Sequence, residues 1–265
     1  MPSAKSFDGQ IALITGASSG LGRHFATTLA AAGARIAVAS RRKSLLDGLA
    51  LEIEDSGGKA FAVTLDQTDS ASVSTAVEKV ESEFGPIDIL INNAGIIRDR
   101  TITKMSREEW RAVMDVNLDG VFYASKYGLE IMRDGGAIVS LGSIAGIVGV
   151  FGQANYAAAK AGVMAMMRVL ARECARRNIR ANAVAPGVAE TPMAATIPEN
   201  VRRAIRFAAM YMGEDHDAPN YDPEHKIIRS PFHGGAGPLL SLDDPQRPDL
   251  IHSTGVTTGK VELVR

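Results

Sequence analysis

The sequence predicts an α/β protein built on a doubly wound parallel sheet. Short apolar runs rich in Ile, Val and Leu alternate with amphipathic segments of helix length from about residue 11 to residue 184. Continuous apolar runs of this kind are typical of parallel strands that are buried on both faces. Strand–helix–strand repetition implies right-handed crossovers, with ligands bound beyond the carboxyl ends of the strands.

Each element of this fold corresponds to a segment of the sequence. Chain length and an ordinary composition, 46% hydrophobic and 22% charged, suit a single domain over residues 1–265. The amphipathic segments predict helices near residues 21–32, 42–56, 69–84, 106–132 and 154–178. The apolar runs predict strands at residues 11–15, 35–39, 60–65, 87–91, 137–141 and 180–184.

Charge and cysteine content exclude several classes of function. A net charge of −1 gives no reason to expect nucleic acid or an anionic membrane as the main partner. The single cysteine, Cys174, excludes an intrachain disulfide and fits a reducing compartment. No uncharged run approaches the length that spans a bilayer, and residues 1–10 lack the apolar core of a signal peptide. We therefore expect a cytoplasmic protein.

A glycine-rich turn follows the first predicted strand. It reads Thr15-Gly16-Ala17-Ser18-Ser19-Gly20-Leu21-Gly22, and a helix is expected to begin within it. Glycines allow the backbone to approach a pyrophosphate, whose charge is favoured at a helix N-terminus. The spacing is G-x-x-x-G-x-G instead of the commoner G-x-G-x-x-G. Its position between the first strand and the first helix predicts a dinucleotide site at Gly16, Ser18, Ser19, Gly20, Leu21 and Gly22.

The end of the second strand indicates which dinucleotide binds. An acidic side chain there accepts a hydrogen bond from the ribose of NAD, whereas arginine accommodates the 2′-phosphate of NADP. This chain has Ser40, Arg41 and Arg42 and no carboxylate at the strand end. NADP(H) is therefore favoured over NAD. Arg41 is the first choice for the phosphate contact, and Arg42 either assists it or points to solvent.

Four polar side chains are candidates for the chemistry. Tyr156 and Lys160 are four residues apart, so on a helix they share one face, and a nearby cation favours the phenolate. Ser143 follows the fifth strand, where a hydroxyl can reach a substrate carbonyl. Asn117 lies inside a predicted helix, where its side chain competes for backbone groups. The alternatives are a packed tyrosine beside a solvated lysine, and an asparagine that only caps or bends its helix.

Together these motifs resemble the short-chain dehydrogenase/reductases over residues 7–205. The resemblance rests on residues 15–22 and 92–95, Asn117, Ser143, Tyr156-x-x-x-Lys160 and Pro186-Gly187. It implies a Rossmann-type fold and hydride transfer between a nicotinamide and a carbonyl or secondary alcohol. Within the family, residues 93–100, 105–110 and 151–156 look like the 3-oxoacyl-thioester reductases and 3-hydroxyacyl-CoA dehydrogenases.

The resemblance assigns a role to each catalytic candidate. Tyr156 would exchange a proton with the substrate oxygen, and Lys160 would lower the pKa of that phenol and hold the nicotinamide ribose. Ser143 would hydrogen-bond the carbonyl oxygen. Asn117 would position Lys160 through a water molecule. No metal is required.

The resemblance also implies the cofactor contacts and a substrate wall. Thr191 would hold the nicotinamide carboxamide, Asp66 would contact adenine, and Asn93 would brace the sheet beside the adenosine. The expected cofactor contacts are Gly16, Ser18, Ser19, Gly20, Leu21, Gly22, Ser40, Arg41, Arg42, Asp66, Asn93, Ala94, Gly95, Tyr156, Lys160, Pro186, Gly187, Val188 and Thr191. The expected substrate wall is Ser143, Ile144, Val148, Gln153, Tyr156 and Met193, with ordinary packing as the alternative for Ile144, Val148, Gln153, Val188 and Met193.

The chain departs from the family pattern after residue 205. Residues 206–258 are rich in proline and glycine and contain His216, His225, His233 and His252, which we interpret as loop and not as a metal site. Residues 259–264 resemble a closing strand. This segment is a substrate lid, a subfamily insertion or a scrambled reading frame. A family helix that packs the tetramer is missing, so we expect a homodimer through residues 106–132 and 154–178, with a tetramer left open.

The reaction is predicted more sharply than its substrate. A small-molecule acyl thioester is the first choice. The alternatives are another ketone, a sugar alcohol or a steroid, or a non-catalytic protein that senses a dinucleotide.

Overall fold

The computed structural model describes residues 6–187, 189, 191–197 and 199, together with the backbone of three short strands. These strands are β7 (Tyr221–Asp222), β8 (Ile227–Arg229) and β9 (Pro238–Ser241), which form an antiparallel sheet of their own. Apart from them, the predictions for Val188, for residues 206–258 with their histidines, and for the closing strand at 259–264 lie outside the described residues.

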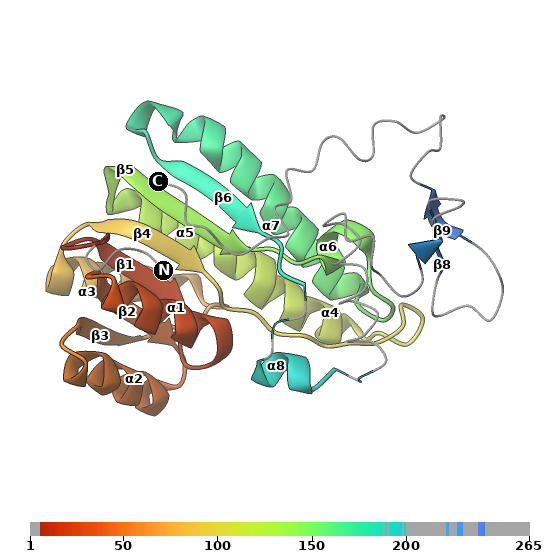
Figure 1. The fold of residues 1–265 in the computed structure, drawn as a ribbon, viewed down its shortest axis with the longest axis horizontal. Helices are drawn as coiled ribbons and strands as arrows, with labels where there is room; N and C mark the ends of the chain where they lie inside the picture. Colours follow the sequence, from red (N-terminus) through yellow and green to blue (C-terminus); the bar gives the residue numbers. More distant parts are fainter. Residues whose placement is uncertain are drawn as a thin grey trace.

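The core of the described part is a six-stranded parallel sheet (Figure 1). Its strand order is β3-β2-β1-β4-β5-β6, and each neighbouring pair is parallel. The order reverses between β1 and β4, the point where doubly wound sheets bind their ligands. The predicted fold class is confirmed. The strands are β1 (Ile11–Thr15), β2 (Arg35–Ser40), β3 (Lys59–Thr64), β4 (Ile87–Asn92), β5 (Met132–Leu141) and β6 (Arg180–Val184).

Helices cover both faces of this sheet and form two hydrophobic layers. In β1, Ile11 and Leu13 pack into one layer while Ala12 and Ile14 pack into the other. A strand buried on both faces needs apolar residues at every position, which explains the continuous runs. One layer contains α3 (Ser70–Phe84), α5 (Gly120–Glu130) and α7 (Ala154–Glu173), and the other contains α1 (Gly20–Ala31) and α2 (Lys43–Asp55).

The remaining helices are short. They are α4 (Arg107–Met114), α6 (Ala145–Val148) and α8 (Pro192–Ala195). A capping box between Ser106 and Glu109 fixes the start of α4. No helix in the described part of the chain is long and apolar enough to cross a membrane.

The predicted helix at 106–132 is wrong as a single element. It divides into α4 and α5, separated by a π-helical turn at Asp115–Asp119 that contains Asn117. The chain is then already strand at Met132, because Met132 pairs with Ile87 before a register irregularity in the β4–β5 ladder. The break coincides with a tertiary contact, since the Asn117 side chain is hydrogen-bonded to the Ile96 backbone and not to its own helix.

Candidate active site

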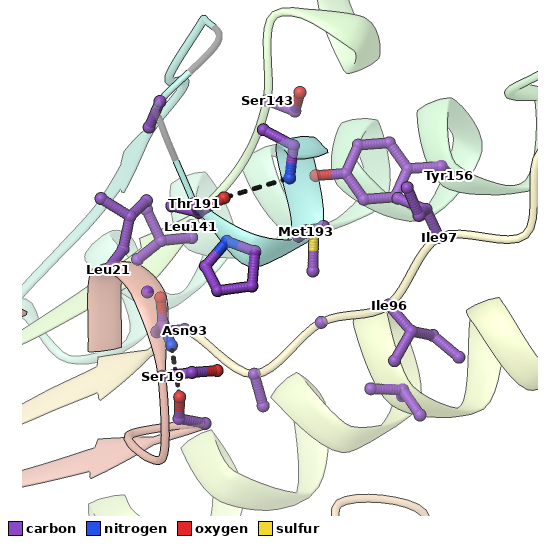
Figure 2. A pocket seen from close by; sticks show the side chains of 18 of the residues that line it. Ser19, Leu21, Asn93, Ile96, Ile97, Leu141, Ser143, Tyr156, Thr191 and Met193 are labelled. Atoms are coloured by element: carbon purple, nitrogen blue, oxygen red, sulfur yellow. Dashed lines mark hydrogen bonds between the residues drawn. The ribbon is translucent and has the colours of Figure 1, made fainter. Parts of the chain in front are cut away.

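A cavity of about 490 Å³ lies at the carboxyl end of the sheet. Figure 2 shows Ser143 and Tyr156 at one end of it and Ser19 and Asn93 at the other. Every described residue that we expected at the cofactor lines this cavity, except Gly22. The lining residues among them are Gly16, Ser18, Ser19, Gly20, Leu21, Ser40, Arg41, Arg42, Asp66, Asn93, Ala94, Gly95, Tyr156, Lys160, Pro186, Gly187 and Thr191.

The glycine-rich turn is packed against the loop that follows β4. Gly16 has a φ of +67°, and a Cβ on it would lie 2.7 Å from the Cα of Ala94. Asn93 Nδ2 donates to the carbonyls of Thr15 and Gly16 at 3.0 and 3.2 Å. Gly22 lies behind the turn, where a Cβ would come within 2.4 Å of Asn93 Nδ2. Asn93 therefore braces the turn, and Gly22 allows this close packing without lining the cavity.

The start of α1 has the properties of an anion site. Its N-cap residue, Ser19, makes no side-chain capping bond, and the first turn contains no acidic residue. Backbone N–H groups at a helix start need a partner, and the helix dipole favours a negative one. A pyrophosphate bound here would supply those acceptors. The turn therefore fits a dinucleotide.

Arg42 lies against this turn instead of pointing to solvent. Its guanidinium donates to the Ser18 hydroxyl, from Nε at 3.1 Å and from Nη2 at 2.7 Å, and to the Ser19 hydroxyl at 2.9 Å. Of the two arrangements that we expected for Arg42, these bonds favour the one at the turn, and the residue as a whole is exposed. Arg41 lies at the exposed edge of the cavity. Two cations therefore flank the place where β2 meets the turn.

The end of β3 adds an anionic and an amide side chain. The Asp66 carboxylate accepts from the backbone N–H and the hydroxyl of Thr68 at 3.0 and 2.8 Å. The backbone bond is the main cause that lowers the pKa of Asp66, and the charge of Arg41 adds to it. Gln67, which we did not predict, also lines the cavity. It is buried, and neither of its amide atoms has a hydrogen-bond partner in the described part of the chain.

Lys160 lines the cavity but is nearly inaccessible to solvent, since it is 3% exposed. Its Nζ donates to the Leu141 carbonyl at 2.6 Å and lies 5.7 Å from the centre of the Tyr156 ring. Burial lowers the pKa of Lys160 to about 8. The ammonium therefore remains mostly charged at neutral pH, and it donates its hydrogen bond to the end of β5.

The pKa of Tyr156 is raised, which corrects the lowering that we expected from Lys160. Burial is the main cause; a hydrogen bond with the Ser143 hydroxyl works in the other direction, and the charge of Asp99 raises it further. Desolvation penalises the phenolate, and the Lys160 ammonium is engaged with a carbonyl instead of the phenol oxygen. This partly buried phenol therefore keeps its proton at neutral pH and can donate it.

Asn117 holds the loop after β4 and does not line the cavity. Its Nδ2 donates to the Ile96 carbonyl at 2.9 Å, and its Oδ1 accepts from the Ile96 N–H at 2.8 Å. A Cβ on Gly95 would lie 3.4 Å from Asn117 Oδ1 and 3.7 Å from Lys160 Nζ. Asn117 and Lys160 therefore meet at Gly95, although the water bridge between them stays a prediction.

The expected substrate wall is only partly present. Ser143, Gln153, Tyr156 and Met193 line the cavity. Ile144 is 1% exposed in the protein interior and Val148 is 42% exposed, and neither lines it. The wall also contains residues that we did not predict, and many of them adjoin a predicted residue in the sequence. The unpredicted lining residues are Leu65, Gln67, Ile96, Ile97, Val116, Leu141, Gly142, Ala145, Ala189, Pro192, Ala194 and Ile197.

Comparison with solved structures places this fold among known enzymes. A dehydrogenase/reductase from Sinorhizobium meliloti aligns with a TM-score of 0.72 at 31% identity, over 76% of this chain and 80% of that one. A short chain dehydrogenase from Burkholderia cenocepacia, solved in complex with NADP, aligns with a TM-score of 0.68 at 36% identity, over 71% of this chain and 77% of that one.

Sequence comparison leads to the same group. The 3-oxoacyl-[acyl-carrier-protein] reductase FabG of Thermotoga maritima is 45% identical over 197 residues, which cover 74% of this chain and 80% of that protein. The protein of the same name from Escherichia coli is 42% identical over 202 residues, which cover 76% of this chain and 82% of that protein. A domain of unknown function matches residues 191–254, so much of the divergent segment has counterparts elsewhere. The family model described as short chain dehydrogenase matches residues 10–202, and the chain therefore belongs to the short chain dehydrogenase family of oxidoreductases.

Proposed function

We propose that this protein is an NADP(H)-dependent reductase of 3-oxoacyl thioesters. One observation carries the proposal: a single cavity has an anion-binding helix start at one end and a partly buried phenol, a buried serine hydroxyl and a buried lysine at the other. The first end suits a dinucleotide, and the second suits acid–base chemistry at a carbonyl. The similar 3-oxoacyl-[acyl-carrier-protein] reductases support the choice of substrate.

The described residues suit NADP(H) in particular. The turn at Gly16–Gly22 would hold the pyrophosphate, and Arg41 and Arg42 would meet the 2′-phosphate. Asp66 would contact the adenine, and Thr191 would hold the carboxamide at the other end. Bound NADPH supplies the hydride for reduction of the carbonyl carbon. The relative solved with NADP supports this choice of cofactor.

The side chains at the catalytic end divide the chemistry between them. Tyr156 donates a proton to the carbonyl oxygen, and its raised pKa keeps the phenol protonated at neutral pH. Ser143 donates a hydrogen bond to the same oxygen as negative charge develops on it. Lys160 is the cation beside the ring, with its ammonium 5.7 Å from the ring centre and anchored to the Leu141 carbonyl. Asn117 holds the loop that carries Gly95 beside Lys160.

Apolar side chains near the catalytic end support an acyl substrate. Met193 lines the cavity and is 37% exposed. Phe151 and Ile102 are 79% and 67% exposed, on two loops joined by a 2.7 Å hydrogen bond from the Arg100 N–H to the Gly152 carbonyl. Apolar surface of this kind gains from contact with a hydrocarbon chain. A sugar alcohol would gain little from it.

We also propose a homodimer located in the cytoplasm, with one catalytic domain per chain. Phe122 on α5 and Val169 on α7 are 50% and 52% exposed, although both are apolar. Burial of these side chains against a second copy would remove them from water. The one cysteine, Cys174, is a buried free thiol, which suits a reducing compartment.

The proposal is tested by NADPH consumption with acetoacetyl-CoA and a panel of simple ketones, sugar ketones and steroids. We expect the thioester to be reduced fastest. Tyr156→Phe should lower turnover by about 10²–10⁴-fold, because it removes the proton donor. Its NADPH affinity and melting temperature should change little. Tyr127→Phe is the matched control, because it removes a phenol oxygen that bonds Ser70 outside the cavity.

Three outcomes would contradict parts of this assignment. Near-normal turnover by Tyr156→Phe would eliminate the proposed proton donor. Faster reduction of a steroid or sugar ketone would replace the substrate class. Cofactor binding without turnover of any compound would identify a dinucleotide-sensing protein instead of an enzyme.

A further inference from the structure

Asp99 occupies a fixed position beside the start of α7. It lies on the loop between β4 and α4, two residues after Ile97 in the cavity wall. The loop is tied to the helix on both sides of Asp99. The fully buried Asn155 donates from Nδ2 to the Arg98 carbonyl at 3.0 Å, and the Arg100 N–H donates to the Gly152 carbonyl at 2.7 Å. These bonds hold the Asp99 backbone against the residues that precede Tyr156.

The Asp99 side chain orients an amide in the cavity wall. Its Oδ2 accepts from Gln153 Nε2 at 2.8 Å. Gln153 is 2% exposed, lines the cavity and is the N-cap residue of α7, three positions before Tyr156. A carboxylate only accepts hydrogen bonds, so the amide nitrogen must face Asp99 and the amide oxygen must face the other way. Asp99 therefore decides which polar atom of Gln153 is available in the wall of the cavity that Tyr156 also lines.

The negative charge of Asp99 is not neutralised by an ion pair in the described residues. Arg100, next to it, instead pairs with Glu109 of α4, from Nε at 3.1 Å and Nη2 at 2.8 Å. Arg98 is on the same loop, and its Nη1 donates to the Ile97 carbonyl at 2.8 Å. From α7, Lys160 is the cation near the phenol.

The negative charge of Asp99 affects the ionisation of Tyr156. Burial is the main cause that raises the pKa of Tyr156, and the charge of Asp99 adds to it. Asp99 is exposed as a residue, yet burial of its carboxyl raises its own pKa, and the hydrogen bond from Gln153 opposes that rise. The carboxylate and the phenolate thus disfavour each other across the start of α7.

On the basis of the proposed function, we propose that Asp99 is a positioning residue for the Tyr156 proton donor. Its carboxylate fixes the Gln153 amide in the cavity wall, and its negative charge extends to higher pH the range in which the phenol keeps its proton. Reduction of a carbonyl requires that protonated form. Asp99 acts through Gln153 and through its charge, without contact with the substrate.

Two substitutions separate the parts of this proposal. Asp99→Asn removes the charge but keeps a side-chain oxygen that accepts from Gln153. Asp99→Ala removes both. Asp134→Asn is the matched control, because Asp134 is 74% exposed and pairs with Arg177 on the surface. The ionisation of Tyr156 is measured as tyrosinate absorbance over a range of pH. For each protein, the absorbance of the same protein carrying Tyr156→Phe is subtracted.

We expect the ionisation midpoint of Tyr156 to fall in Asp99→Asn and in Asp99→Ala, and to stay in place in Asp134→Asn. The pH profile of kcat for alcohol oxidation should move in the same direction. KM should rise in Asp99→Ala and change little in Asp99→Asn, because only the first frees the Gln153 amide.

An unchanged midpoint in Asp99→Asn, or an equal shift in Asp134→Asn, would overturn the charge effect. Equal KM values for the two Asp99 variants would overturn the positioning effect. The optical titration uses no substrate, so it separates this inference from the proposed function. A midpoint shift in a protein that reduces no carbonyl would support the inference while the enzyme assignment failed.

Discussion

The two ends of the cavity are built in different ways. The turn consists of main chain and exposed side chains, with Gly16 at a positive φ and Arg41 open to solvent. The proposed catalytic end is built from buried polar side chains, since Asn117, Lys160 and Ser143 are 0%, 3% and 8% exposed. Exposed charges interact weakly through water, whereas buried ones act strongly and cost stability. Substitutions of exposed side chains at the turn should therefore affect cofactor affinity, whereas substitutions of the buried polar side chains should affect the chemistry and the fold.

The largest effect should come from the main chain of the turn. Gly16→Ala adds a methyl group 2.7 Å from the Ala94 Cα, at a positive φ. Strain and overpacking together should lower the free energy of unfolding by about 4 kcal/mol, measured by urea denaturation. NADPH affinity should fall as well.

Gly57→Ala is the control that separates the two causes. Gly57 also has a positive φ, of +82°, but a Cβ there would meet nothing within 4 Å. It should therefore cost only about 1–2 kcal/mol, from backbone strain. Equal losses in both variants would show that the packing of the turn against the loop after β4 contributes nothing.

The next largest effect should appear at the buried lysine. The pKa of Lys160 is lowered by burial to about 8 in the folded protein, against 10.5 for a free lysine. Between these values the unfolded chain binds more protons than the folded one, so the free energy of unfolding rises with pH. Lys160→Met lacks this group. The free energy of unfolding of the wild type minus that of the variant should therefore increase by about 3 kcal/mol from pH 8 to pH 10.5.

The measurement is urea denaturation of both proteins at several pH values in that window. Lys79→Met is the matched control, because Lys79 is exposed on α3. A stability difference that stays constant with pH in Lys160→Met would contradict the burial of a charged lysine. If the stability difference between wild type and Lys79→Met also rose with pH, the effect would come from charge in the unfolded chain and not from the burial of Lys160.

Local patterns in the sequence were sufficient to predict the fold and the placement of the turn. The strands are marked by continuous apolar runs, because both faces of the sheet are buried. The turn is marked by Gly16 and Gly20, whose positive φ values few other residues adopt. The four-residue spacing of Tyr156 and Lys160 also needed no tertiary information, since both belong to one helix.

Features that depend on distant contacts were not predictable in this way. The π-helical turn at Asn117 exists because its amide bonds Ile96, which is 21 residues away in the chain. The direction of the Tyr156 pKa was predicted wrongly, because helical spacing does not reveal that Lys160 donates to Leu141. Hydrogen-bond partners across loops are set by the folded chain as a whole.

The smallest effect should come from the exposed cation at the turn, where water and salt weaken electrostatic interactions. Arg41→Asp should weaken NADPH binding by about tenfold and leave NADH binding nearly unchanged, because only NADPH carries the 2′-phosphate. Lys43→Asp is the matched charge reversal, since Lys43 is also exposed but does not line the cavity. Fluorescence titration of both cofactors measures the ratio. Equal weakening of NADPH and NADH would remove Arg41 from the phosphate site and leave Arg42, held by Ser18 and Ser19, as the residue that selects the cofactor.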